Sequence, residues 1–247
     1  MLAAQHIEEL KKFDTPTISN GIEFFGIRPR NEGFTNPSIH KVFSNDKRIV
    51  GYACTAKISA LKPPTDPQKK LQDLYYAKVK DAPKPTITVI EDVDPQPIGA
   101  FWGEVQVTLH RSLGCVAVIT NGGVRDLDEV KNLDFEYFSN CLLVSHVFVH
   151  VEAVDCLVTV GGLTVRPCDL IHADKHGAIV IPAEVAPYLA EACRAAQDAE
   201  GSVLHNCRKH FPKGDADAKN IAAWRTEMNE RRVKYMQKFS ALVKKGY

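Results

Sequence analysis

The sequence predicts an α/β protein in which helices are layered on a mixed β-sheet. Segments with a helical apolar face alternate with β-branched runs up to about residue 120, and a block of short strands begins at about residue 136. The chain then closes in helices. This order fits a layered α/β domain better than a uniform strand–helix–strand repeat. A length of 247 residues and an apolar content of 45% suit one large domain, or one domain with an extension.

The first half of the chain has the clearest helix and strand patterns. Residues 3–12 have an amphipathic helical pattern, and Asp14 or Thr15 followed by Pro16 is a typical start for a second short helix. Residues 48–59 alternate as a strand, and a proline-rich loop follows them. The elements expected next are a helix over 69–82, a strand over 85–92, a helix over 100–114 and a buried strand over 115–120.

The second half begins with short strands and ends with helices. Turns at Gly, Pro and Asp cut residues 136–182 into strands, and one hairpin there would place His172 and His176 at a surface turn. Helices are expected over 183–209 and 214–247. From residue 207 onward there are eleven Lys and Arg against four Asp and Glu. A basic helix of this kind could bind an acidic partner, but it is more often a solvated face or packs on a neighbouring subunit.

The composition is typical of a cytoplasmic protein. A formal net charge of +1 gives no general reason to expect binding to nucleic acid or membranes. There are seven cysteines, an odd number without a CxxC pair, and most lie in apolar runs, which indicates reduced and buried thiols. The first helix carries acidic residues and lacks the apolar core of a signal peptide, and no apolar run approaches the length of a membrane span.

Three charged residues are brought together by the predicted geometry of one helix and one strand. Glu104 lies near the start of the helix over 100–114, which advances about 15–20 Å to its end. The strand over 115–120 then runs back about 20 Å. If the two elements are antiparallel, Arg125 and Asp126 return to the level of Glu104, at the kind of sheet edge where α/β proteins bind ligands.

The chemistry of these residues suits a small α-keto acid chelated to a divalent metal. The guanidinium of Arg125 is a planar fork that binds a carboxylate through two hydrogen bonds. Asp126 offers hard oxygen ligands for Mg²⁺ or Mn²⁺. Gly122 and Gly123 allow backbone N–H groups to approach an anionic ligand closely.

The same stretch also has a purely structural interpretation, and the pattern alone leaves both open. Asp126 followed by Glu129 matches a capping box, and Asn121-Gly122-Gly123 is an ordinary turn signal. Other candidates are weaker. His146 and His150 have the spacing of a helical metal pair but alternate as a strand, which would set them about 13 Å apart. No Rossmann, P-loop, zinc-protease or nucleophile-elbow motif occurs.

The stretch GEVQVTLHRSLGCVAVITNGGVRDLDE resembles the RraA-like family, which includes metal-dependent 4-hydroxy-4-methyl-2-oxoglutarate aldolases. The family motif is an acidic residue, twenty intervening residues and then Arg-Asp, and Glu104, Arg125 and Asp126 match that spacing. The segments FDTPTISNGI, VGYACTAKIS and GGLTVRPCDLIHADKHGAIVIP are similar to further blocks of the family. The resemblance therefore covers most of residues 13–200.

This resemblance implies a fold and an assembly. The expected fold is an α/β/β/α sandwich of the swivelling-domain type with a mixed sheet, assembled as a homotrimer or homohexamer with active sites between subunits. Residues 1–203 would form the catalytic domain. Residues 204–247 lie largely outside the resemblance and would form a basic helical extension.

The resemblance also implies roles for individual residues. The resemblance implies that substrate is bound by Arg125 and by backbone N–H groups of the loop 98–103, which contains Gly99, Trp102 and Gly103. Asp126 would hold Mg²⁺ or Mn²⁺, and Glu104 would position a water for proton transfer. Glu200, from the closing helix of a neighbouring subunit, would help to hold metal-bound waters.

The chain departs from the family pattern at three positions. Glu104 stands where the aldolases often have Asp, Asn121 stands where Asp is common, and Cys168 replaces the glycine of a Pro-Gly-Asp block. The first departure could alter the choice of substrate. The other two are expected at turns and should affect stability.

The sequence therefore predicts a class II, metal-dependent pyruvate aldolase with oxaloacetate decarboxylase activity. The alternative is a non-catalytic, oligomeric binding protein that regulates a nuclease or another partner. Family members that bind a nuclease do not keep the Arg-Asp pair, whereas this chain keeps it as Arg125-Asp126, which favours the enzyme. A methyltransferase is disfavoured because the chain has no glycine-rich nucleotide loop.

Overall fold

The computed structural model describes residues 1–243, which divide into two compact units. One is a β-rich unit that contains residues 3–15 and 31–182, and the other is a helical unit that contains residues 16–30 and the chain from 183 onward. The expected domain boundary after residue 203 falls inside helix α6 (Leu189–Arg208). The end of the predicted C-terminal helix, residues 244–247, lies outside the described residues.

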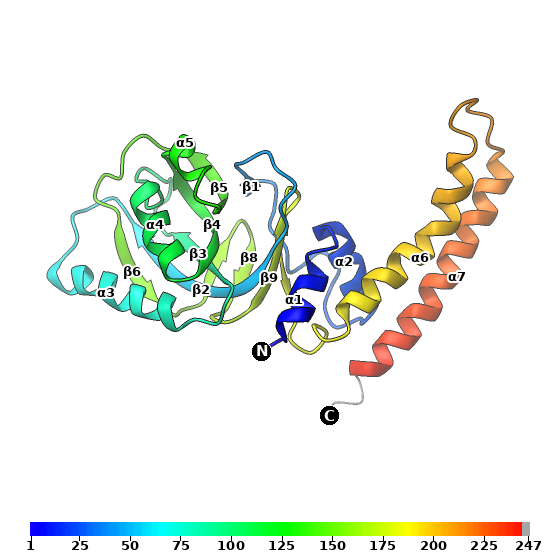
Figure 1. The fold of residues 1–247 in the computed structure, drawn as a ribbon, viewed down its shortest axis with the longest axis horizontal. Helices are drawn as coiled ribbons and strands as arrows, with labels where there is room; N and C mark the ends of the chain where they lie inside the picture. The colour runs from blue at the N-terminus through cyan, green and yellow to red at the C-terminus, as the bar shows by residue number, and fades with distance from the viewer. Residues whose placement is uncertain (244–247) are drawn as a thin grey trace. The chain divides into compact units, whose positions relative to one another are not determined.

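The β-rich unit is built on one mixed eight-stranded sheet (Figure 1), which confirms the predicted α/β class. Its central strands β2, β3, β4 and β5 run parallel to one another, and the flanking strands pair with them or with each other in antiparallel fashion. The order is β1-β5-β4-β3-β2-β9-β10, and β6 also pairs with β2. The bounds are β1 (His40–Lys41), β2 (Ile49–Ser59), β3 (Thr86–Asp92), β4 (Cys115–Val124), β5 (Glu136–Leu142), β6 (His150–Val154), β9 (Leu170–Asp174) and β10 (Gly177–Ile181).

Each face of this sheet buries its own apolar cluster. Helices α3 (Asp66–Asp81) and α4 (Glu104–Ser112) contribute Tyr75, Val79 and Val107 to the cluster on one face. A two-stranded ribbon, β7 (Val158–Val160) with β8 (Leu163–Val165), contributes to the cluster on the other face. Strand β3 serves both, because Ile87 and Val89 belong to the ribbon cluster and Ile90 to the helix cluster. Two short helices complete the unit, α1 (Ala4–Leu10) and α5 (Leu127–Val130).

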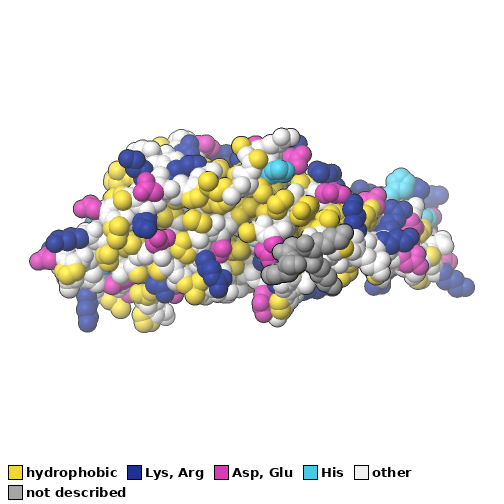
Figure 2. Space-filling view, turned by 90° about the horizontal axis from the view of Figure 1, so that it is seen from below, with side chains coloured by type: hydrophobic (Ala, Val, Ile, Leu, Met, Phe, Trp, Pro, Cys, Tyr) yellow, Lys and Arg dark blue, Asp and Glu magenta, His cyan; other side chains and the backbone are white. Residues whose placement is uncertain are grey.

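The helical unit consists of α2 (Thr15–Glu23), α6 and α7 (Ala218–Val243). Helices α6 and α7 lie side by side, and α7 also packs on the end of α2, where the Phe24 and Phe239 rings stack 6.2 Å apart. Arg232 of α7 forms an ion pair with Glu23 at 3.2 Å. Figure 2 shows Lys and Arg side chains gathered toward the turn between α6 and α7, where Arg208, Lys209 and Lys213 are exposed. The basic helix therefore packs within its own chain along one side.

His172 is a core residue, and its expected place at a surface turn is wrong. The hairpin β9–β10 forms as predicted, but His172 is fully buried. Its Nε2 lies 3.0 Å from the carbonyl oxygen of Phe13, and its Nδ1 lies 3.0 Å from the Thr15 hydroxyl. Burial lowers the pKa of His172 to about 4. These partners come from the N-terminal segment, so the local pattern around the histidine could not reveal them.

The cysteine and hydropathy expectations have mixed outcomes. None of the seven cysteines, all of which lie within residues 1–243, forms a disulfide, but only Cys54, Cys115 and Cys193 are buried, and Cys168 is exposed. Within residues 1–243 no helix combines the length and the apolar character needed to cross a membrane.

Candidate active site

The candidate site lies where strand β4 ends beside the first turn of α4. Trp102 forms an isolated parallel bridge with Val124, and the Arg125 N–H donates to the Trp102 carbonyl oxygen at 2.9 Å. The helix begins at Glu104, four residues later than predicted, because the residues before it are extended beside β4. Glu104 meets Asp126 as the predicted geometry required, through its backbone N–H, which donates to Asp126 Oδ2 at 2.9 Å.

Asp126 does not cap its own helix. Its backbone is left-handed, with φ 57° and ψ 48°, and its side chain makes no capping hydrogen bond to α5. This conformation costs a non-glycine residue on the order of 1 kcal/mol or more and is enriched at functional sites. The carboxylate instead lies at the first turn of α4, where unpaired N–H groups and the helix dipole favour a negative charge. The capping-box interpretation of Asp126 and Glu129 is therefore wrong.

Gly103 makes this arrangement possible. A Cβ atom at residue 103 would collide with Asp126 Oδ2 and would lie 3.1 Å from Arg125 Nε. Its backbone is extended, so any residue could adopt its conformation. Glycine is therefore required here for space.

The predicted turn at Asn121-Gly122-Gly123 is wrong, because these residues lie inside strand β4. The pairing register with β5 shifts between Thr120 and Gly123, which marks a bulge. Asn121 ties β4 to the end of β3 by two hydrogen bonds of 2.8 Å, accepting from the Asp92 N–H and donating to the Asp92 carbonyl oxygen. An aspartate could accept the first bond but could not donate the second, so this departure from the family pattern has a structural role.

Asp92 itself is an unusual buried carboxyl group next to the bulge. Its Oδ1 accepts the Asp94 N–H at 3.0 Å, and its Oδ2 is buried without a hydrogen-bond partner in the described chain. Burial raises the pKa of Asp92 to about 6. A Cβ atom at Gly122 would lie 3.1 Å from Oδ2, so the glycine gives the carboxyl group its space.

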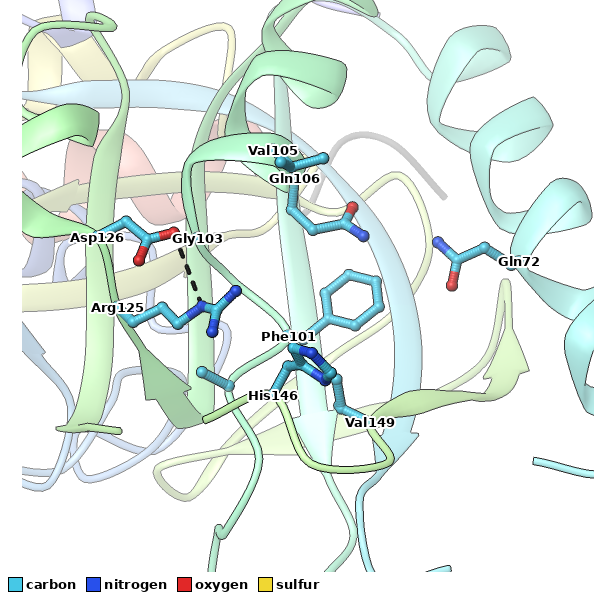
Figure 3. A pocket seen from close by; sticks show the side chains of 10 residues that line it. Gln72, Phe101, Gly103, Val105, Gln106, Arg125, Asp126, His146 and Val149 are labelled. Carbon is cyan, nitrogen blue, oxygen red and sulfur yellow. Dashed lines mark ion pairs between the residues drawn. The ribbon is translucent and has the colours of Figure 1, made fainter. Parts of the chain in front are cut away.

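A pocket of about 240 Å³ opens at this junction (Figure 3). Arg125 and Asp126 line one side of it, and the side chain of each is 34% exposed. The remaining lining residues are Gly103, Ala100, Phe101, Val105, Val149, Gln72, Gln106 and His146. Its size is below the roughly 300–1,000 Å³ of sites for drug-sized ligands, so the pocket suits a small molecule.

The charged side of the pocket has capacity to bind further groups. Arg125 Nε lies 3.7 Å from Asp126 Oδ2, and within residues 1–243 the two terminal guanidinium nitrogens make no hydrogen bond or ion pair. Asp126 Oδ1 is likewise without a hydrogen bond in the described part of the chain. The site therefore offers a fork for a carboxylate, a carboxylate oxygen, and the N-terminal end of a helix.

The other residues expected at the site do not line this pocket. The Trp102 side chain is 0% exposed in the helix-side cluster, where it stacks on Phe135, so only its backbone supports the site. Gly99 packs against Ala60 and the His146 carbonyl, where a Cβ atom would find no space. The Glu104 residue is exposed and is not among the pocket-lining residues. Glu200 belongs to the helical unit, where it accepts a hydrogen bond from Asn20 at 3.1 Å.

Sequence reasoning missed most of the uncharged lining residues. Gln106 follows Glu104 by two positions on α4, and Gln72 comes from the middle of α3. Neither belongs to a motif, so only the spatial arrangement identifies them. The sequence pattern offers His146 only as a metal-ligand candidate paired with His150, but His146 lies in the loop before β6 and lines the pocket without His150.

The donor set can be tested against a divalent metal. No group of three or more His, Cys, Asp or Glu residues that could hold a metal occurs within residues 1–243. Asp126 supplies one carboxylate with one free oxygen. Mg²⁺ commonly keeps several waters and binds through one or two carboxylates together with substrate oxygens. The residues therefore fit a metal held by Asp126, waters and substrate, and do not fit an all-protein cage.

The chain is similar to several known proteins. It is 26% identical over 196 residues to an uncharacterized protein of Methanocaldococcus jannaschii, covering 78% of this chain and 85% of that one. It is 25% identical over 153 residues to a Halalkalibacterium halodurans protein provisionally named 4-hydroxy-4-methyl-2-oxoglutarate aldolase, covering 61% and 68%.

Among solved structures, Streptomyces coelicolor RraAS2, described as an unusual member of the RNase ES inhibitor RraA family, has the same fold. Its TM-score is 0.63 at 19% identity, over 81% of this chain and 93% of that one. The family model described as RraA-like: Aldolase/RraA matches residues 15–180, which include all of β2 to β9 and the Glu104, Arg125 and Asp126 positions. The chain belongs to the RraA-like family.

Proposed function

We propose that this protein is a divalent-metal-dependent lyase that cleaves 4-hydroxy-2-oxo acids to pyruvate and decarboxylates oxaloacetate. One observation carries the proposal. The guanidinium of Arg125 and the free carboxylate oxygen of Asp126 face one small pocket at the N-terminus of a helix. The aldolase name of the Halalkalibacterium halodurans relative supports the same activity.

Substrate binding would use the charged side of the pocket. The carboxylate of a 2-oxo acid would accept two hydrogen bonds from the terminal nitrogens of Arg125. Further N–H groups in the first turn of α4 would add to this binding. Asp126 would hold Mg²⁺ or Mn²⁺, which when bound acts as a Lewis acid for the negative charge on the keto oxygen.

Both reactions break the bond between C3 and C4 and leave the electron pair on pyruvate enolate. In retro-aldol cleavage the C4 hydroxyl loses a proton to a base, an aldehyde or keto compound leaves, and a proton is added at C3. In decarboxylation CO₂ leaves and no hydroxyl proton is removed. Glu104, whose side chain is exposed at the start of α4, is proposed to position the water that takes the hydroxyl proton. Decarboxylation should therefore survive Glu104→Gln better than retro-aldol cleavage.

A homotrimer or homohexamer with active sites at subunit boundaries is part of the proposal. Exposed apolar side chains of the β-rich unit near the pocket support it. Ile98 precedes the lining residues Ala100 and Phe101, and Val144 precedes the lining residue His146. Both side chains are exposed, Val144 to 96%. In such an assembly Glu200 of a neighbouring subunit would help to hold metal-bound waters. The assembly is tested by the mass in solution, and the role of Glu200 by the metal affinity of Glu200→Gln.

The decisive experiment is pyruvate release from oxaloacetate, with EDTA and after Mg²⁺ or Mn²⁺ is added back. Free metal ions decarboxylate oxaloacetate slowly, so each rate is corrected by a sample with equal metal and no protein. Release should stop with EDTA and return with metal, and Arg125→Ala should lose it. Arg225→Ala is the matched control, since Arg225 is exposed on α7. Pyruvate release at an unchanged rate in EDTA, or full activity in Arg125→Ala, would refute the mechanism.

The alternative from the sequence is a non-catalytic partner-binding protein, and it predicts the opposite results in these assays. It requires no turnover of any keto acid and a partner recovered by pull-down. The fold is shared with a structure from the RNase ES inhibitor family, but the fold alone does not separate the two functions.

A further inference from the structure

The side of the pocket away from Arg125 and Asp126 is lined by neutral groups. Figure 3 shows the carboxamides of Gln72 and Gln106 pointing toward one another, with the Phe101 ring beside them. The two glutamines come from different helices, α3 and α4. Their hydrogen-bonding state shows what kind of ligand group this end can bind.

The amide of Gln106 is held in one orientation. Its Oε1 accepts a hydrogen bond from the Tyr76 hydroxyl at 2.9 Å. A hydroxyl donates well to the oxygen of an amide, so the amide nitrogen is left as the group that faces the pocket. Gln106 therefore presents N–H donors to a ligand.

The amide nitrogen of Gln72 is a second donor. It is buried and has no hydrogen-bond partner within residues 1–243. A buried donor that stays unpaired costs about 1–3 kcal/mol. A ligand oxygen that accepts from this nitrogen would remove the cost, and the site would gain affinity for a hydrogen-bond acceptor.

The acceptor that fits is neutral. Arg125 is the single Lys or Arg among the described residues that line the pocket, and under the proposed function the 2-oxo acid carboxylate uses it. A second carboxylate at the far end would lie against Phe101 and Val149 without a cation. His146 also lines the pocket, and its Nδ1 pairs with the Val147 carbonyl oxygen at 2.8 Å. A carboxylate that loses water against apolar side chains without gaining a cation is unfavourable.

We infer that the pocket selects 2-oxo acids whose far end is a neutral hydrogen-bond acceptor, with Gln72 and Gln106 as the residues that determine this specificity. The inference rests on the proposed function and narrows it for substrates longer than oxaloacetate, whose second carboxylate is C4 itself and leaves as CO₂. It separates this chain from enzymes named for 4-hydroxy-4-methyl-2-oxoglutarate, whose far end is a second carboxylate. The preferred substrate is a 4-hydroxy-2-oxo monoacid with a ketone carbonyl at C5.

The test uses two isosteric substrates, a 4-hydroxy-2-oxo acid with a methyl ketone at C5 and one with a carboxylate at C5. The native protein should give at least a tenfold higher kcat/KM for the ketone. Gln106→Glu keeps the oxygen that accepts from Tyr76 but replaces the donor, and should lower kcat/KM for the ketone at least tenfold. Gln72→Arg supplies a cation and should raise kcat/KM for the carboxylate at least tenfold.

Two controls separate the failure of this inference from failure of the proposed function. Exchange of the C3 protons of pyruvate with D₂O involves no far-end group, so exchange by the native protein reports the proposed function separately from the far-end specificity. Thr108→Glu adds a carboxylate at an exposed position on the same helix and should leave the substrate ratio unchanged. Equal use of both substrates, preference for the carboxylate, or an unchanged ratio in Gln106→Glu overturns the inference while exchange persists. Absence of exchange in the native protein overturns the proposed function, and the inference with it.

Discussion

Replacing Gly103 by alanine tests the geometry of the site with one methyl group. The new Cβ atom would overlap Asp126 Oδ2 and press on Arg125 Nε. Because the backbone of Gly103 is extended, alanine adds no conformational strain. The substitution therefore acts only by moving the two side chains that the mechanism requires.

The expected magnitude follows from the contacts. Ordinary van der Waals separation requires Asp126 Oδ2 to move by about 1 Å, which is enough to cost about a hundredfold in rate when reacting groups are misplaced. The movement also breaks the 2.9 Å hydrogen bond from the Glu104 N–H, and a bond to a charged group contributes about 1.5–3 kcal/mol. Alanine also lowers the conformational entropy of the unfolded chain, which stabilises the folded state by about 0.4–1 kcal/mol. The net loss of stability should be about 1–2 kcal/mol.

Two measurements check this prediction, the rate of pyruvate release from oxaloacetate with metal present and the free energy of unfolding in urea. Gly201→Ala is the control, because a Cβ atom there meets nothing within 4 Å and alanine favours the helix α6. The control should keep full activity and gain about 0.5–1 kcal/mol of stability. A Gly103→Ala protein with activity within threefold of the native rate, and with native stability, would refute the geometric argument.

Three further predictions concern stability. Cys168→Gly should stabilise the fold by about 0.5–1 kcal/mol in urea titrations, because Cys168 holds a left-handed φ of 67° that glycine adopts without strain; an unchanged midpoint would contradict this. Asp92→Asn should raise the free energy of unfolding by about 2 kcal/mol at pH 8 and leave it unchanged at pH 4. Burial raises the folded-state pKa of Asp92 to about 6, so the native protein loses stability as pH rises from 4 to 6, and the neutral asparagine avoids this loss. A gain that is independent of pH would refute this prediction. Burial lowers the pKa values of His110 and His172 to about 4, so near pH 6.5 these side chains bind protons only in the unfolded chain. Each should therefore lower the free energy of unfolding by about 1 kcal/mol per pH unit as pH falls from 6.5 to 4, and Asp92 should offset part of this loss below pH 6. Urea unfolding curves that coincide between pH 7 and pH 5 would contradict this.

The elements could be predicted where the local pattern and the buried face agree. The strand over 48–59, the helix over 69–82 and the meeting of Glu104 with Asp126 follow from periodicity and rise per residue, and the structure has them within a few residues. The helix predicted over 183–209 also forms, but it begins six residues later, at Leu189. These features depend on one segment or on two segments that are adjacent in sequence. The pattern within those segments is therefore enough to predict them.

The failures all involve contacts between distant segments. Gly122 and Gly123 read as a turn, but the space they leave is filled by Asp92 and Leu143, so the strand continues through them. Trp102 reads as a pocket residue, but its indole packs on Phe135 in the core. The far end of the pocket needs Gln72, which no motif connects to Arg125.

The bond between Asp126 and Glu104 has a consequence for folding experiments. It joins residues 22 positions apart, and it requires a left-handed backbone at Asp126 that the isolated segment would not favour. No short peptide that contains Arg125 and Asp126 could reproduce the site, since its anion-binding helix comes from an earlier segment. Under the proposed function, pyruvate release should return during refolding only once α4 has docked beside β4, so the recovery of this activity would time the docking without a spectroscopic label.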